Sequence, residues 1–487
     1  MAVKKKALKK TATAAAKKAS AKSGEKSGTV ESRRARIRMY RVGLGDCFLL
    51  TFFKEGKEEH VLIDCGMFAG SRLDPNAKEK DIQVEIVNHI AETTGGHINA
   101  VVITHEHMDH VSIFNSAKDV FDAKLSFGEA WFGWLEDPHN KVAADLREKY
   151  EGLKLTLGAA LSELKSLAVS NPEDYEQLHG GVAQIAEFTG LAADGSQIAE
   201  QPRKAMDFVK QKAGKDKLRF GSPGNTWEIA GVKVRVLGPP PTEAQLRTMD
   251  RAGASYDRAL LLGIAGDSEE NQRLLPFSAQ WRRSVAVNAS GLAFTPPQDN
   301  TGLGMSLARY NDSQEAWRRI DNQASNSASS LALQMDKYIN NTSLALAFEL
   351  PGGDVLLFPG DAQVGNWDSW FDIKKELFDV PDLLKRTIFY KVGHHGSHNA
   401  TLKPALEQMT HPKLVAMIPT NEKFAKESKH WTMPAPNLYD ALNEHTGKRL
   451  LRNDQGVGAI VDPMKDGDWD GLEKNVTVDR LFIDYFV

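Results

Sequence analysis

Three histidines and an aspartate lie in one short segment directly after a largely apolar run. Residues 98–103 have the composition of a buried strand, and residues 104–110 read Thr-His-Glu-His-Met-Asp-His. His105 and His107 are two residues apart, so on an extended backbone their side chains point to the same side. Asp109 and His110 follow at the point where the chain must turn. Their side chains can therefore reach a second metal position, next to that of His105 and His107. Two adjacent metals roughly 3.5–4 Å apart are a known arrangement for hydrolysis.

Two later loops carry further ligand types, each after an apolar strand. Asp361 follows a predicted strand at 355–358, and a pair of histidines beginning at His394 follows another at 387–392. The open ends of strands in an α/β layer usually hold ligands, so we expect these loops to meet the first motif. Asp361 would suit a carboxylate that bridges two metals. Asp64 also ends a strand, and we expect it to orient a ligand without binding the metal itself.

The composition excludes several classes of protein. The chain has 487 residues, of which 41% are apolar and 26% charged, as in ordinary globular proteins. No apolar run approaches the ~18–20 residues that span a bilayer, and no secretory signal core follows the basic start. The two cysteines, Cys47 and Cys65, argue against a disulfide framework and for a reducing compartment. These features predict a cytoplasmic protein that does not contact a membrane.

Residues 1–35 form a Lys/Ala-rich basic arm that we predict to be disordered, because it has almost no large apolar residues. Residues 1–41 contain 14 Lys and Arg against two acidic residues, although the whole chain has a net charge of −3. A basic arm on an acidic body is typical of contact with polyanions. The arm therefore predicts a nucleic-acid tether, and the alternative is a solubilising or targeting tail. The oligomeric state stays open.

Residues 36–487 are predicted to form one α/β domain. Strands at 37–42, 47–53 and 60–63 precede a helix at 80–92 and the motif strand, an order typical of a layered α/β body. Residues of about 115–220 are predicted to be mostly helical, with Leu153, Leu157, Leu161 and Leu164 on one core-facing side. Residues of about 242–335 are interpreted as an insertion that shapes substrate access or a partner surface.

Several motifs carry a family resemblance. The His-x-His-x-Asp-His segment resembles the signature of the metallo-β-lactamase superfamily. Three further segments resemble the ComEC-type branch of that superfamily: Val42-Gly43-Leu44-Gly45-Asp46-Cys47, Asn341-Thr342-Ser343, and Lys391-Val392-Gly393-His394-His395-Gly396-Ser397. The resemblance covers roughly residues 37–115, 225–240 and 340–462. The membrane channel that is joined to this domain in the competence proteins is absent from the sequence.

The resemblance implies an αββα sandwich with a helical insertion. It also implies a divalent metal, one or two zinc ions with manganese as the alternative. The implied ligands are His105, His107, Asp109, His110, Asp361 and His394. His394 is preferred over His395, because superfamily members generally use the first histidine of this loop. The chain departs from the wider pattern, since no histidine occurs between His179 and His394. The metal position of His105 and His107 therefore lacks a third histidine.

The implied activity is metal-dependent hydrolysis, with a phosphodiesterase or nuclease as the leading hypothesis. A metal-bound hydroxide, held by Asp109 or Asp361, would attack the substrate. His395 or His398 would protonate the leaving oxygen, and Ser397 would either bind a phosphate oxygen or cap the following helix. Two alternatives stay open: a small-molecule hydrolase for a lactone, thioester or lactam, and a nonhydrolytic regulatory protein that contains a metal.

Overall fold

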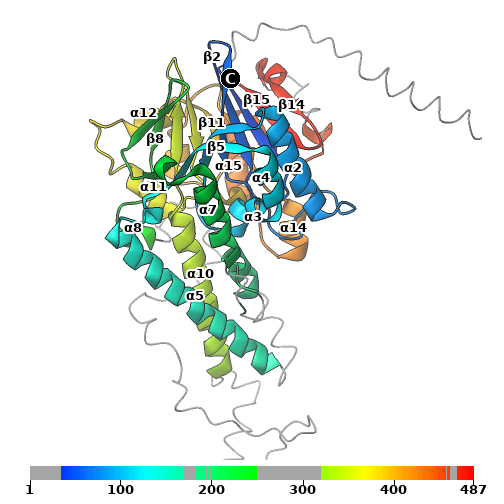
Figure 1. Ribbon diagram of the computed structural model, residues 1–487, viewed down its shortest axis with the longest axis vertical. Helices are drawn as coiled ribbons and strands as arrows, with labels where there is room; N and C mark the ends of the chain where they lie inside the picture. The colour runs from blue at the N-terminus through cyan, green and yellow to red at the C-terminus, as the bar shows by residue number, and fades with distance from the viewer. Residues whose placement is uncertain are drawn as a thin grey trace, which may run out of the picture.

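The computed structural model in Figure 1 describes residues 34–168, 182–192, 196, 200–248, 320–456, 458–460 and 469–487. The predicted basic arm lies outside the described residues, apart from its last two. Residues 249–319, most of the predicted insertion, also lie outside them.

Two sheets form the centre of the molecule. The first has eight strands in the order β14-β15-β1-β2-β3-β4-β5-β6, and the second has seven in the order β13-β12-β11-β10-β9-β8-β7. The strands of the first sheet are β1 (Ala35–Tyr40), β2 (Phe48–Lys54), β3 (Lys57–Ile63), β4 (His97–Val102), β5 (Ser126–Gly133), β6 (Leu218–Gly221), β14 (Val476–Val478) and β15 (Phe482–Phe486). Those of the second are β7 (Thr226–Ile229), β8 (Val232–Val236), β9 (Leu346–Glu349), β10 (Val355–Phe358), β11 (Thr387–Lys391), β12 (Val415–Ile418) and β13 (Leu450–Arg452).

The two sheets pack face to face around one apolar core. Ile37 and Leu50 of the first sheet belong to the same buried cluster as Phe348 and Phe358 of the second. Helices cover the outer faces: α2 (Glu79–Thr93), α3 (Met108–Ser116), α4 (Lys118–Lys124) and α7 (Glu200–Ala213) lie on the first sheet. On the second lie α11 (Val364–Trp370), α12 (Val380–Lys385), α13 (Lys403–Leu406) and α15 (Pro436–Thr446). The predicted αββα layering is confirmed.

The predicted helical stretch is interrupted by a strand. Residues 126–133 form β5, which pairs in parallel with β4 and β6. Its second half is buried, and a strand covered on both faces shows no alternation of apolar and polar residues. Trp131 of β5 is fully buried in the core between the sheets. The following Trp134 is also buried and donates from its indole N–H to the carbonyl of Pro240 at 3.1 Å.

Two long helices extend from the sandwich. Helices α5 (Lys141–Ala168) and α10 (Ile320–Asn341) cross each other below the sheets in Figure 1, and they share a buried cluster with Val182, Ala183, Ala186 and Leu191. Leu157 and Leu161 of α5 are buried there as predicted, whereas Leu153 is 38% exposed. Between α5 and α10 in sequence, the short helix α8 (Glu243–Leu246) begins the predicted insertion.

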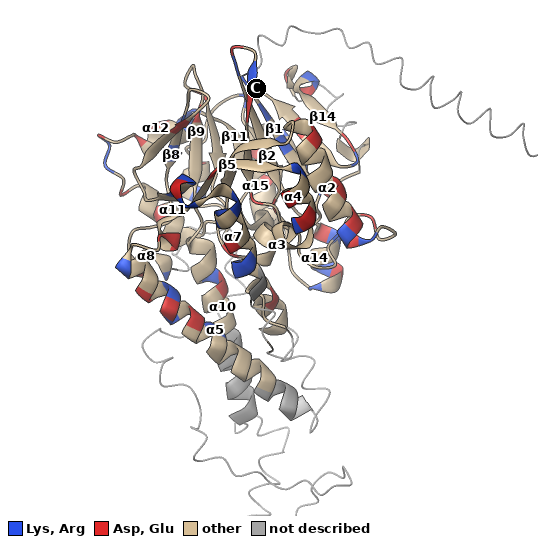
Figure 2. Cartoon of the chain, viewed as in Figure 1, with Lys and Arg blue, Asp and Glu red and all other residues tan. Residues whose placement is uncertain are grey.

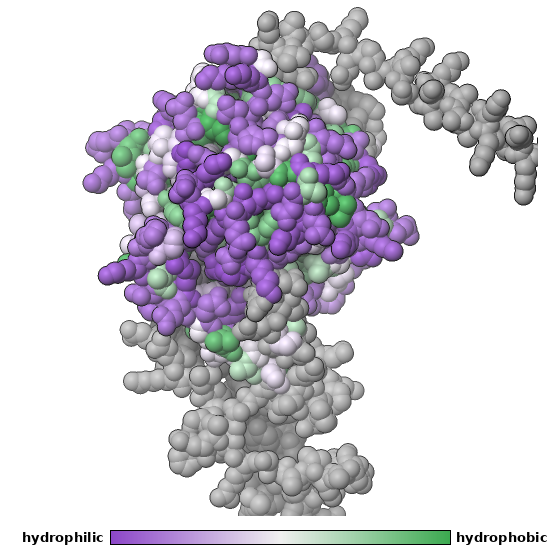
Figure 3. All heavy atoms as spheres, in the orientation of Figure 1, coloured by the Kyte–Doolittle hydropathy of each residue, from purple (hydrophilic) through white to green (hydrophobic). Residues whose placement is uncertain are grey.

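The surface is that of a protein with its apolar residues inside. Figure 2 shows charged residues gathered on outer helices such as α2 and α5, and few of them on the central strands. The described surface on the face seen in Figure 3 is mostly hydrophilic. None of the helices within the described ranges has an apolar stretch long enough to cross a bilayer.

Candidate metal centre

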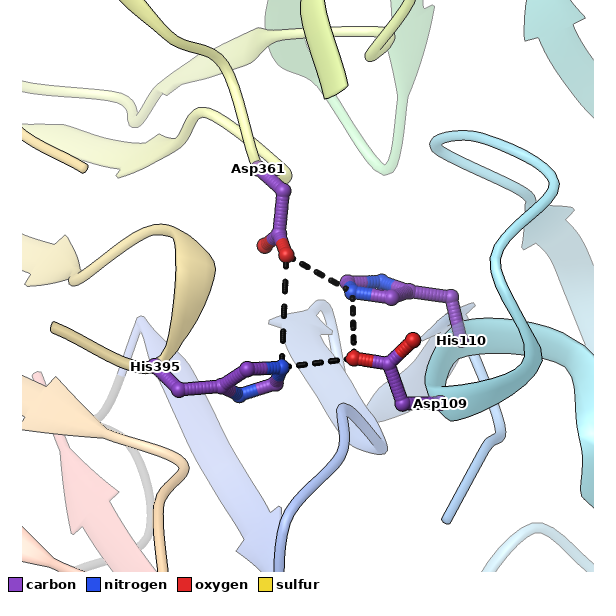
Figure 4. A group of neighbouring side chains, drawn as sticks. All are labelled: Asp109, His110, Asp361 and His395. Atoms are coloured by element: carbon purple, nitrogen blue, oxygen red, sulfur yellow. Dashed lines mark hydrogen bonds and ion pairs between the residues drawn. The ribbon is translucent and has the colours of Figure 1, made fainter. Parts of the chain in front are cut away.

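Loops from both sheets meet at one edge of the sandwich. Asp109 and His110 lie in the first turn of α3, which follows β4. Asp361 follows β10, and His395 lies in η7 (His394–Gly396), a 3₁₀ helix of one turn after β11. Figure 4 shows these four side chains pointing toward one another. All four are buried, and one ligand atom from each lies within 4.8 Å of the others.

The shortest contacts in this group join imidazole nitrogens to carboxylates. His395 Nε2 lies 2.6 Å from Asp109 Oδ2, and His110 Nε2 lies 3.1 Å from Asp361 Oδ2. His395 Nδ1 donates to the carbonyl oxygen of Pro419 at 2.7 Å. That carbonyl can only accept, so a neutral His395 ring presents its Nε2 lone pair toward the group. Nitrogen and carboxylate lone pairs that converge in this way are the ligand set of a divalent metal.

His105 and His107 form a second set beside the first. His105 Nε2 lies 3.1 Å from His107 Nδ1, and the ring of His105 lies 4.1 Å from that of His110. Burial lowers the pKa of His105 well below its usual value, and burial lowers the pKa of His107 to about 3. Both rings are therefore neutral near pH 7, as metal ligation requires. The two sets of side chains therefore form two adjacent candidate metal positions.

His394 and His395 take different places. The backbone N–H of His394 donates to Asp361 Oδ1 at 2.8 Å, and its side-chain Nδ1 lies 3.4 Å from Gln363 Nε2. The structure therefore brings the side chain of His395, and not that of His394, into the group with Asp109, His110 and Asp361. The sequence preference for the first histidine of the loop does not match this arrangement.

Asp64 lies behind His110. Its carboxylate lies 2.8 Å from His110 Nδ1 and accepts from the Thr104 hydroxyl at 2.6 Å. The ring is thereby fixed with Nε2 toward Asp361. This is the contact expected of a carboxylate that orients a metal-binding histidine.

Lys391 and Asp46 belong to the centre, although sequence reasoning assigned neither a role. Lys391 is buried, and its ammonium contacts Asp46 and lies 3.1 Å from Asp361 Oδ1. Burial opposes the charge of Lys391, but the carboxylates of Asp46 and Asp361 outweigh that effect and raise its pKa. Asp46 and Lys391 lie in two of the sequence motifs that carry the family resemblance. Their place in those motifs was the signal that could have identified them as members of the centre.

Ser397 and His398 lie at the end of the same loop. Ser397 is buried, and its hydroxyl donates to the side-chain oxygen of Asn399 at 3.1 Å. This contact is neither the phosphate contact nor the helix cap that the sequence predicts for Ser397. His398 is half-buried and lies close enough to His394 to lower the pKa of that ring, an effect smaller than burial itself.

A close backbone approach explains one glycine at the site. A Cβ on Gly66 would lie 2.3 Å from the carbonyl carbon of Asp109 and 2.4 Å from the amide nitrogen of His110. The neighbouring Cys65 donates its N–H to the carbonyl of His110 at 2.8 Å. The loop after β3 can therefore hold the first turn of α3 in place only with a glycine at position 66.

The centre carries more negative charge than its side chains balance. Burial lowers the pKa of His110, but the carboxylates of Asp361, Asp46 and Asp109 outweigh burial and raise it well above its usual value. Within the described residues, Asp109 Oδ1 and His107 Nε2 are buried without a hydrogen-bond partner. The unpaired carboxylate oxygen of Asp109, beside several other carboxylates, favours a bound cation. The residues present therefore fit one or two divalent metals.

Two sheets between helix layers, with histidines and carboxylates at their common edge, define an αββα protein with a candidate metal centre. Residues 40–184 match the sequence model of the metallo-beta-lactamase superfamily. No curated protein matches the chain. The matched segment contains the first motif and Asp64. Asp361 and His395 lie outside it in sequence, and the fold brings them to the same group of side chains. The match and the buried His/Asp cluster together indicate a metal-dependent hydrolase.

Proposed function

We propose that this protein is a metal-dependent phosphodiesterase that uses one or two divalent ions, zinc or manganese. The observation that carries the proposal is the pair of adjacent ligand sets, with the rings of His105 and His110 4.1 Å apart. Divalent ions bound there supply Lewis acidity and activate a water for attack.

The chain's own residues hold the reacting groups in place. Asp361 Oδ1 accepts from the backbone N–H of His394 at 2.8 Å and lies 3.1 Å from Lys391 Nζ, which leaves Oδ2 toward His110. His395 uses both ring nitrogens, one toward Asp109 and one toward a backbone carbonyl. Protonation of the leaving oxygen is therefore better assigned to His398 than to His395, because burial lowers the pKa of His394 to about 4 and leaves that ring without a proton to give near pH 7.

An aromatic cluster borders the centre, and its members Phe68 and Phe188 are buried. Phe188 lies 5.7 Å from the ring of His107, and it stacks on Trp431 with ring centroids 5.3 Å apart. Phe68 packs against both, and the ammonium of Lys429 lies 4.8 Å from its ring. Trp431 is half-buried and offers a ring on which a nucleobase could stack, whereas the charge of Lys429 is already paired with Glu187 at 2.6 Å.

A small-molecule hydrolase is the second candidate, because the site is narrow. A cavity of about 40 Å³ adjoins His105 and is lined by Tyr150, Arg203 and Tyr338 from α5, α7 and α10. The ligand side chains themselves are almost fully buried. A lactone or thioester fits such a space more readily than a long polymer does.

The deciding experiment combines metal analysis with turnover. Purified protein is analysed for metal content, and hydrolysis of a bis-aryl phosphodiester is measured with and without added manganese. About two metals per chain with turnover would support the phosphodiesterase. One metal and turnover of a lactone or thioester, with none of the diester, would favour the small-molecule hydrolase. Protein that binds no metal under any condition would refute both.

The proposed role of the basic arm has a separate test. Deleting residues 1–33 leaves β1 intact, because that strand begins at Ala35. We expect the deletion to slow turnover of long nucleic acid at low salt, where basic contacts to phosphate are strongest. Turnover of the small diester should not change. Equal loss on both substrates would contradict a tether.

A further inference from the structure

Three of the four histidines at the centre have a partner for the ring nitrogen that faces away from it. His110 Nδ1 lies 2.8 Å from Asp64, and His395 Nδ1 donates to the Pro419 carbonyl at 2.7 Å. His105 Nδ1 lies 3.0 Å from the Thr104 hydroxyl. The fourth, His107, is the exception: its Nε2 is buried and has no hydrogen-bond partner among the described residues.

The nearest carboxylate to that nitrogen comes from the long helix α10. His107 Nε2 lies 3.9 Å from Asp336 Oδ1, and the Asp336 side chain is 12% exposed. The other oxygen of Asp336 accepts from Asn340 Nδ2 at 3.2 Å, so Oδ1 is the oxygen left toward the histidine. A movement of about 1 Å brings the pair to an ordinary hydrogen-bond length of ~2.9 Å.

The ring geometry of His107 argues against Asp336 as a direct metal ligand. His105 Nε2 and His107 Nδ1 are 3.1 Å apart, close to the ~3.3 Å that separates two ligand atoms on a tetrahedral zinc with bonds of 2.0–2.1 Å. The metal side of His107 is therefore Nδ1. Nε2 lies on the opposite side of the ring, which is the side that Asp336 faces.

Helix α10 holds Asp336 firmly, because its end is fixed to the sandwich. Asn341, five residues after Asp336, is fully buried and donates to the carbonyls of Leu246 and Thr248 at 3.1 and 2.9 Å. It also accepts from the backbone N–H of Asn366 at 3.1 Å. The backbone of α10 near Asp336 is thereby fixed, so the approach of about 1 Å to His107 is made by rotation of the side chains.

We propose that Asp336 is the positioning residue of His107. Its carboxylate accepts the hydrogen on Nε2, and this fixes the tautomer whose Nδ1 lone pair faces the metal. Helix α10 thereby sets the metal affinity of the position that lacks a third histidine. The inference rests on the metal centre of the proposed function. Outer carboxylates of this kind typically change metal affinity 10- to 100-fold.

The test measures metal affinity at both positions by titrating chelator-stripped protein with zinc against a competing chromophoric chelator. We expect Asp336→Ala to weaken one of the two sites about 10- to 100-fold and to leave the other unchanged. Asp336→Asn, which keeps the shape and one acceptor oxygen, should weaken the same site less. Met335→Ala is the matched control, since Met335 is a buried neighbour on α10 without a polar group, and it should keep both affinities.

Three results would overturn the proposal. The first is unchanged zinc affinity in Asp336→Ala, and the second is the same loss in Met335→Ala, which would make the effect one of helix packing. The third is an altered visible spectrum of the fully cobalt-loaded Asp336→Asn protein, because that would place Asp336 on the metal itself. Wild-type protein that binds no zinc would instead refute the proposed function, so the two failures are distinguishable.

Discussion

At the residue scale, two adjacent histidines differ because of their backbone. His394 and His395 both have left-handed φ angles, +43° and +52°, which non-glycine residues rarely adopt. Such conformations cost of order 1–3 kcal/mol each and persist where the surroundings fix them. Here the N–H of His394 is held by Asp361 and the ring of His395 by Pro419 and Asp109.

We therefore expect His395→Ala and His394→Ala to differ strongly. His395→Ala removes a ligand atom from the group and should lower hydrolytic activity on the order of 100-fold or more, with loss of bound metal. His394→Ala removes no atom of that group and should keep the full metal content. Elemental analysis and diester turnover of the two variants provide the comparison. Full metal content in His395→Ala, with loss in His394→Ala, would reverse the assignment.

The ligand-bearing loops were predictable from the sequence, but their detailed arrangement was not. Asp109, His110 and Asp361 follow apolar strands, and that pattern is visible without a structure. The choice between His394 and His395 depends on backbone angles that no residue pattern reveals. Asp336 is separated from the first motif by more than 200 residues. No pattern in the sequence distinguishes it from other acidic residues on helices.

A buried histidine remote from the centre predicts a loss of stability in acid. Burial lowers the pKa of His60 to about 4, whereas an unfolded chain has a histidine pKa of about 6.5. The unfolded state therefore binds more protons between these values, so stability is lost as the pH falls from about 6.5 toward 4. The difference in melting temperature between about pH 7 and about pH 5 should shrink in His60→Gln. The exposed His139→Gln is the control, and an equal change in both would contradict the prediction.

At the scale of elements, one ion pair joins the strands at the two ends of the described chain. Arg38 of β1 donates to both carboxylate oxygens of Asp484 of β15 at 2.7 Å, and both side chains are buried. Asp484→Ala leaves a buried charge without its partner and should cost about 3–5 kcal/mol of stability.

A surface ion pair serves as the control for this prediction. Glu243 and Arg247 are neighbours on one helical turn, with side chains 36% and 50% exposed, so Glu243→Ala should cost less than about 1 kcal/mol. Thermal denaturation of both variants measures the difference. Equal melting temperatures would show that the β1–β15 pair does not stabilise the sheet.

Elements with clear periodicity were predicted well, and buried strands less so. Helix α2 and strand β10 match their predicted ranges closely. Strand β5 was hidden in the predicted helical stretch, because burial on both faces removes the alternation that identifies a strand. Asn341, part of a motif quoted for the family resemblance, ends α10, and its side chain fixes that helix to the sandwich.

At the scale of the whole molecule, metal binding should stabilise the fold. The four carboxylates Asp46, Asp64, Asp109 and Asp361 lie in one buried region with Lys391, so a bound cation relieves their repulsion. A hundredfold excess of metal over its dissociation constant contributes about 2.7 kcal/mol per site. Chelator-treated protein should therefore melt several degrees higher after zinc or manganese is added.

Magnesium is the control for that experiment, because it prefers oxygen ligands over imidazole and should raise the melting temperature less. A melting temperature that no divalent metal changes would contradict a metal centre in the folded protein.

The position of β15 has a consequence during protein synthesis. Strand β1 lies between β2 and β15, and Ile37 pairs with Leu50 on one side and with Tyr485 on the other. While the ribosome is still adding the residues that precede β15, one edge of β1 has no partner strand. At 5–20 residues per second this interval lasts about 20–90 s, and an open strand edge can pair with other chains. The edge of β1 that β15 will cover therefore stays open to mispairing until residues 482–486 have left the ribosome.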